Sequence, residues 1–128
     1  MNVLLDTHVA LWAIQDSPLL PPRVREILLS QDNTIYVSAA SLWEISIKFG
    51  LNRGDMPISG KEALGYFRSA GYRILPIEPE HTVEVENLAP HHKDPFDRLL
   101  VAQALVEPMR LITHDPQVAK YSDTVLLV

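Results

Sequence analysis

Four acidic side chains in this sequence of 128 residues have positions from which their carboxylates could act together. Asp6 and Asp115 each follow a short apolar run, whereas Glu44 and Asp97 lie within helical patterns. If the apolar runs are neighbouring parallel strands, all four carboxylates converge on one edge of a sheet. Crowded carboxylates repel one another and raise each other's pKa. A divalent cation removes that repulsion, and Mg²⁺ and Mn²⁺ prefer oxygen ligands, so the pattern indicates a metal-dependent site for phosphate chemistry.

Three of these positions also have purely structural explanations. Asp6 or Thr7 could cap the helix that follows, because a short side-chain oxygen accepts from the exposed N–H groups of a first turn. Asp115 stands before a proline and could be a cap in the same way. Glu44 could pair with Lys48 one helical turn further on. Capping and metal binding are compatible roles, since a capping carboxylate can still face a metal ion.

The segment Asp94-Pro95-Phe96-Asp97 is the densest of the motifs. Asp94 fits the N-cap of a helix, and Pro95 fits the first helical position. Asp97 then falls at the third position, where the acidic partner of a capping box stands. Asp97 also shares its helix face with apolar residues that must face the core. We therefore predict that Asp94 caps the helix and that Asp97 points inward as a ligand.

Strands and helices alternate along the chain. The apolar and β-branched runs predict strands at 3–6, 34–38, 72–77, 110–113 and 124–128. Helical periodicity predicts helices at 7–14, 23–30, 39–49, 59–69, 80–88, 94–106 and 116–121. A turn is expected at 52–55. This order is typical of an α/β fold with a mainly parallel sheet covered on both faces. Sites in such sheets form outside the carboxyl ends of the strands, where Asp6 and Asp115 lie.

Composition limits the class of protein. The length suits a single domain over residues 1–128, and 47% hydrophobic residues provide a substantial core. The absence of Cys and of any apolar stretch of membrane-spanning length leads us to expect a cytoplasmic protein. A net charge of −5 argues against a simple electrostatic clamp on nucleic acid. It is compatible with an enzyme whose metal ions present positive charge to a phosphate.

Two further features complete the pattern. The five histidines have no spacing typical of a zinc site, and we expect His91 and His92 to be a solvated pair in a loop. The predicted helix at 39–49 is apolar on two flanks, with Trp43 on one and Ile45 and Phe49 on the other. We expect one flank to pack on the sheet and the other to bind a partner chain.

Four blocks of this sequence resemble the PIN-domain ribonucleases, specifically the VapC-type toxins of type II toxin–antitoxin systems. The blocks are Leu4-Leu5-Asp6-Thr7-His8 with Leu11-Trp12, and then residues 37–45, 92–104 and 111–115. Their order and spacing and the total length agree with the family, so the resemblance spans essentially the whole chain.

The resemblance implies a three-layer α/β/α sandwich and a Mg²⁺- or Mn²⁺-dependent endoribonuclease. It carries the catalytic and metal-ligating acids over to Asp6, Glu44, Asp97 and Asp115. Thr113 matches an auxiliary hydroxyl beside the fourth acid, and Asp94 could be either a ligand or a cap. The resemblance also implies a homodimer and an antitoxin that occludes the site. Since the site is strongly acidic, we expect the antitoxin to insert an Arg or a Lys.

The expected reaction is cleavage of single-stranded or loop RNA by a metal-activated water, which leaves a 5′-phosphate and a 3′-hydroxyl. One alternative is a catalytically silent PIN-like binding module. A receiver-like signalling domain would need a lysine on a later strand, and Lys93 and Lys120 fall outside the predicted strands. A phosphatase with an Asp-x-Asp motif would need an acid where His8 stands.

Overall fold

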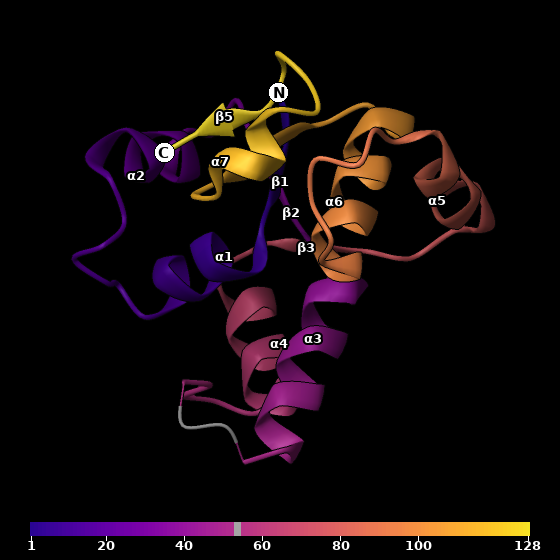
Figure 1. The fold of residues 1–128 in the computed structure, drawn as a ribbon. Helices are drawn as coiled ribbons and strands as arrows, with labels where there is room; N and C mark the ends of the chain where they lie inside the picture. The colour runs from indigo at the N-terminus through magenta and orange to yellow at the C-terminus, as the bar shows by residue number, and fades with distance from the viewer. Residues whose placement is uncertain (53–54) are drawn as a thin grey trace.

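The computed structural model describes residues 1–52 and 55–128, so Arg53 and Gly54 of the expected turn lie outside the described residues. A five-stranded sheet forms its centre (Figure 1), with the strand order β3-β2-β1-β4-β5. The strands are β1 (Asn2–Leu5), β2 (Thr34–Ser38), β3 (Arg73–Leu75), β4 (Arg110–Thr113) and β5 (Leu126–Leu127). Every neighbouring pair is parallel, which confirms the predicted parallel sheet.

Seven α-helices connect the strands within the described residues. They are α1 (Thr7–Ile14), α2 (Pro22–Leu29), α3 (Ala39–Gly50), α4 (Gly60–Ser69), α5 (Pro79–Glu84), α6 (Pro95–Val106) and α7 (Pro116–Ala119). The capping box that begins α4 is present, with reciprocal bonds between Ser59 and Glu62. The single helix expected at 80–88 is wrong in one respect, because it divides into α5 and a 3₁₀ turn, η1 (Val85–Asn87).

Alternation along β1 separates two hydrophobic cores, one on each face of the sheet. Val3 and Leu5 contribute to a core with α1, α2, α4 and the middle of α3. Leu4 points to the opposite face and packs with residues of α6 and α7. Because successive side chains of a strand point to opposite faces, one short strand anchors both layers of helices. The result is the three-layer α/β/α sandwich that the resemblance implied.

Helices α3 and α4 lie side by side and extend away from the sheet (Figure 1). Their contact is close at Gly60, where an added Cβ would lie 1.9 Å from the Ser46 hydroxyl oxygen. Of the residues on the two apolar flanks, Ile45 is fully buried while Trp43 is 57% exposed. Phe49 shares the flank of Ile45, but it is 46% exposed because the last turn of α3 extends beyond the body of the protein.

Among the described residues, none of the helices has the length and apolar character that crossing a membrane requires.

Candidate active site

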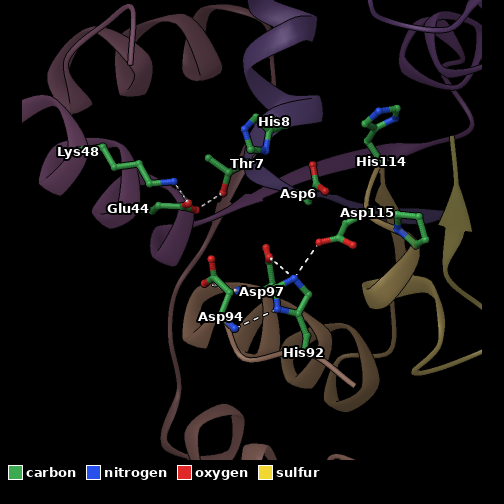
Figure 2. A pocket seen from close by; sticks show the side chains of 11 residues that line it. Asp6, Thr7, His8, Glu44, Lys48, His92, Asp94, Asp97, His114 and Asp115 are labelled. Carbon is green, nitrogen blue, oxygen red and sulfur yellow. Dashed lines mark hydrogen bonds and ion pairs between the residues drawn. The ribbon is translucent and has the colours of Figure 1, made fainter. Parts of the chain in front are cut away.

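One cavity of about 530 Å³ contains all four acids that the sequence singled out. Asp6 and Asp115 reach it from the carboxyl ends of β1 and β4, Glu44 from α3, and Asp97 from the first turn of α6 (Figure 2). The other residues that line it are Thr7, His8, Lys48, His92, Asp94, His114 and Pro116. The structure thus brings together the carboxylates that the sequence predicted to converge, and their role as metal ligands stays a prediction.

Asp6 is both a helix cap and a lining residue of the cavity. One carboxylate oxygen, Oδ1, accepts the backbone N–H of Val9 at 2.9 Å and so begins α1. The other, Oδ2, accepts the hydroxyl of Thr113 at 2.5 Å. Burial raises the pKa of the Asp6 carboxyl above its ordinary value, while the bonds from Thr113 and Val9 oppose that rise. Asp6 is therefore a buried acid whose two oxygens are each fixed by a donor.

Glu44 is buried at 4% exposure and has two partners. The Thr7 hydroxyl donates to its Oε1 at 2.7 Å, and the Lys48 ammonium lies 2.7 Å from its Oε2. The pairing with Lys48 one turn away is thus present, as the structural explanation of Glu44 predicted. Although partial burial acts to lower the pKa of Lys48, its bond to Glu44 raises that pKa overall. This cation keeps a charged carboxylate tolerable at a buried position.

Asp94 caps α6, because its Oδ1 accepts the backbone N–H groups of Phe96 at 2.8 Å and Asp97 at 3.4 Å. The predicted division of the motif into a cap and an inward-pointing acid is therefore confirmed. Burial and the nearby charges of Asp94 and Asp6 raise the pKa of Asp97 to about 7. A carboxyl with such a pKa is only partly ionised near neutral pH, because it is buried first of all and also lies close to other negative charges.

Asp115 caps α7 through its Oδ1, which accepts the backbone N–H of Gln117 at 2.8 Å. Its Oδ2 lies 2.7 Å from His92 Nε2, and the same nitrogen lies 3.2 Å from Asp97 Oδ2. Burial acts to raise the pKa of Asp115, but the bonds from Gln117 and His92 outweigh it and leave the pKa below its ordinary value.

The expectation that His91 and His92 form a solvated pair is wrong for His92. Its side chain is only 18% exposed and lies between two acids of the cavity, whereas His91 is exposed. The sequence signal was weak, because a histidine in a loop has no periodicity that assigns it to a face. The nearby motif that begins at Asp94 was the one available indication, since a helix that points an acid into a site also brings its preceding loop there.

The donor set fits a divalent cation with a preference for oxygen. Carboxylates from the end of β1, from α3, from α6 and from the β4–α7 junction face one space, and the charges of Asp94 and Asp6 add to burial in raising the pKa of Asp97. A cation among them would lower that repulsion. One oxygen of Asp97 and one of Asp115 also lie within 4.8 Å of each other. The residues present therefore have the number and chemistry that a Mg²⁺ or Mn²⁺ site needs.

Comparison with known proteins agrees with this fold. The sequence model of the PIN domain matches residues 3–123. Among curated proteins, none matches this sequence significantly.

Similar solved structures come from several bacteria. The structure of VapBC2 from Rickettsia felis bound to a DNA fragment from its promoter matches with a TM-score of 0.71 at 19% identity, over 100% of this chain and 98% of that chain. FitAcB from Neisseria gonorrhoeae matches with a TM-score of 0.64 at 20% identity, over 98% and 96% of the two chains. DNA-bound VapBC from Salmonella typhimurium matches with a TM-score of 0.69 at 15% identity, over 100% and 97%. At these identities the likeness is one of fold. The family match along nearly the whole sequence decides the assignment, and this chain belongs to the PIN-domain family.

Proposed function

We propose that this protein is a Mg²⁺- or Mn²⁺-dependent endoribonuclease and the toxin of a toxin–antitoxin pair. The observation that carries the proposal is the convergence of Asp6, Glu44, Asp97 and Asp115 on one cavity of a PIN fold. Asp6 and Asp97 would hold a cation directly. Glu44 and Asp115 would act through water or complete a second site. When bound, the cation would lower the pKa of a water ligand and neutralise oxygens of the phosphodiester.

The chain's own residues would prepare this chemistry by fixing the carboxylates in advance. The Thr113 hydroxyl orients Asp6, and the Thr7 hydroxyl orients Glu44. Such preorganisation matters because a ligand that is already oriented does not have to be ordered during the reaction. Lys48 is the one lysine among the lining residues, and its ammonium could approach a backbone phosphate that enters beside Glu44. Water as the attacking group would leave a 5′-phosphate and a 3′-hydroxyl.

The proposed partners follow from the site and from the similar structures. A further similar structure is described as a toxin–antitoxin complex from Klebsiella pneumoniae, at 17% identity. An antitoxin that fills a cavity with four carboxylates would bring an Arg or a Lys, because a cation satisfies those acids. The exposed apolar side chains of α3 support a homodimer. Residues 1–128 would act as a single catalytic domain in the cytoplasm.

Cleavage of RNA by the purified protein tests the proposal. Total RNA is incubated with the protein and Mg²⁺, and the fragments are sequenced at both cut ends. We expect cleavage within single-stranded or loop segments, 5′-phosphate ends, and loss of activity in a chelator that Mn²⁺ reverses. A silent PIN-like binding module would bind RNA without cutting it. Cleavage that continues in the chelator, or 2′,3′-cyclic phosphate ends, would contradict the metal-activated water.

A further inference from the structure

His92 contacts two of the four acids, yet the proposed reaction gives it no task. Its ring belongs to the loop before α6 and points into the cavity (Figure 2). The Nε2 atom lies 2.7 Å from Asp115 Oδ2 and 3.2 Å from Asp97 Oδ2. One ring atom therefore joins carboxylates from two different elements.

The other ring nitrogen decides where the proton of His92 lies. The backbone N–H of Asp94 points at His92 Nδ1, with 2.9 Å between the two nitrogens. A backbone N–H can only donate, so Nδ1 must accept and carries no proton. In the neutral ring the proton then resides on Nε2, which donates it to Asp115 Oδ2, while Asp97 Oδ2 lies 3.2 Å from the same nitrogen. A protonated ring nitrogen has no lone pair to offer a metal, so this arrangement makes His92 a donor and not a ligand.

The loop that carries His92 is held by further bonds. The backbone N–H of His92 donates to the Tyr121 hydroxyl oxygen at 2.9 Å. The Arg98 guanidinium donates to the same hydroxyl oxygen at 2.9 Å and to the Ala89 carbonyl oxygen at 3.0 Å. Contacts to Arg98 of α6 and to Tyr121, just beyond α7, therefore hold the backbone of this loop from outside the cavity. The position of the imidazole between the acids is set by the fold and not by the acids alone.

We propose that His92 is a positioning residue that competes with the divalent cation for the Oδ2 atoms of Asp97 and Asp115. Its Nε2 proton carries positive partial charge, points at Asp115 Oδ2 and lies close to Asp97 Oδ2, and a cation would use these two oxygens. The bond to Asp115 and the contact with Asp97 stabilise the two negative charges side by side, so a cation that binds there must first displace these interactions. His92 thereby weakens metal binding and holds both carboxylates in place. This inference rests on the proposed metal-dependent function.

The variant His92→Asn separates competition from ligation. The Asn side-chain oxygen can accept the Asp94 N–H in place of Nδ1, but the shorter side chain places no donor between Asp97 and Asp115. Because the cation no longer has to displace this hydrogen bond, we expect Mn²⁺ to bind His92→Asn roughly tenfold more tightly by isothermal titration calorimetry. The matched control is His91→Asn, because His91 is exposed and does not line the cavity; its affinity should equal that of the wild type. Weaker or unchanged Mn²⁺ binding by His92→Asn would overturn the proposal.

A second measurement uses the unaltered protein and does not depend on how any variant folds. Long-range ¹H–¹⁵N NMR of the imidazole rings, recorded without divalent metal, should give His92 a proton on Nε2 and none on Nδ1. The opposite tautomer would overturn the proposal. Neither measurement involves RNA, so a protein that binds Mn²⁺ as expected but leaves RNA intact would contradict the proposed function alone. A wild-type protein that takes no Mn²⁺ would overturn both.

Discussion

Thr113 and Asp6 are 107 positions apart in the sequence, and the Thr113 hydroxyl donates to Asp6 Oδ2 at 2.5 Å. The bond joins the ends of β4 and β1, which are neighbours at the centre of the sheet. Both residues are buried, and Thr113 is completely so. A buried carboxylate stays ionised more easily when a donor is fixed beside it. The adjacent strands therefore help to keep Asp6 in its charged form, which is the form that the proposed metal binding needs.

The variant Thr113→Val tests this contribution, because valine has nearly the same shape but no hydroxyl. Without the donor, the pKa of Asp6 should rise further, and kcat/KM for RNA cleavage should fall about tenfold or more, as expected for a lost bond to a charged group. The control is Thr113→Ser, which keeps the hydroxyl and should retain most of the activity. Equal activity of the valine and serine variants would show that the bond has no role in the reaction.

Asp97→Asn should abolish cleavage and also change how stability depends on pH. The pKa of Asp97 is raised from about 3.8 in the unfolded chain to about 7 in the folded protein, so the folded state binds more protons between these values. The wild-type protein should therefore lose stability as the pH rises from about 4 to about 7, and the Asn variant should lack this part of the loss. Urea unfolding of both proteins in a chelator, at about pH 5 and about pH 8, measures this change in the free energy of unfolding. If the free energies of unfolding of the wild type and of Asp97→Asn differ by the same amount at both pH values, the raised pKa of Asp97 is contradicted.

Asp94→Asn should be a mild variant if Asp94 serves only as the cap of α6. Asn caps a helix about as well as Asp, so both stability and cleavage should stay near the wild-type values. Asp94→Ala removes the cap and should lower the free energy of unfolding by about 1 kcal/mol. Paired measurements of urea unfolding and RNA cleavage distinguish the two roles. Loss of cleavage in Asp94→Asn with stability retained would make Asp94 part of the site.

Inhibition by the proposed antitoxin should depend on the metal concentration. An inserted Arg and a divalent cation would occupy the same acidic space, so high Mg²⁺ or Mn²⁺ should weaken inhibition. Replacing that Arg by Ala should restore cleavage without necessarily separating the two proteins. The measurement is the inhibition constant across a metal titration, with binding followed separately. Inhibition that is indifferent to metal, by a partner with no basic residue near the cavity, would contradict this prediction.

The apolar flank of α3 should mediate a homodimer. Trp43 is 57% exposed, and a large exposed aromatic side chain is typical of an interface. Light scattering at micromolar concentration should give twice the monomer mass for the wild type and the monomer mass for Trp43→Glu. Leu29→Glu is the control, since Leu29 is 82% exposed on α2, away from this flank, and its variant should remain dimeric. A wild type that is monomeric at this concentration would contradict the prediction.

The sequence predicted the features that depend on residues close together in the chain, such as the starts of helices. Asp94 and Pro95 mark the start of α6, and Ser59 with Glu62 marks the start of α4, because capping needs only residues a few positions apart. The convergence of the acids also followed, since parallel strands bring their carboxyl ends to one edge.

The features that were missed depend on contacts between distant segments. The orientation of His92 comes from bonds that involve Arg98 and Tyr121, and no spacing within the loop indicates them. The exposure of Phe49 has a similar origin, because periodicity gives the flank of a helix but not the point at which the helix leaves the protein body. The 3₁₀ turn after α5 likewise interrupts a pattern that looks continuous in the sequence.

The backbone amides that Asp6 and Asp115 cap should respond to what occupies the cavity. Each carboxylate uses Oδ1 for a backbone amide, that of Val9 or of Gln117, and turns Oδ2 to a second partner. Electron density drawn toward a cation at Oδ2 weakens the bond at Oδ1 of the same group. The amide resonances of Val9 and Gln117 should therefore shift when the cavity is occupied. The occupant could be a metal ion, the guanidinium of an inhibitor or RNA, and no label inside the cavity is needed to detect it.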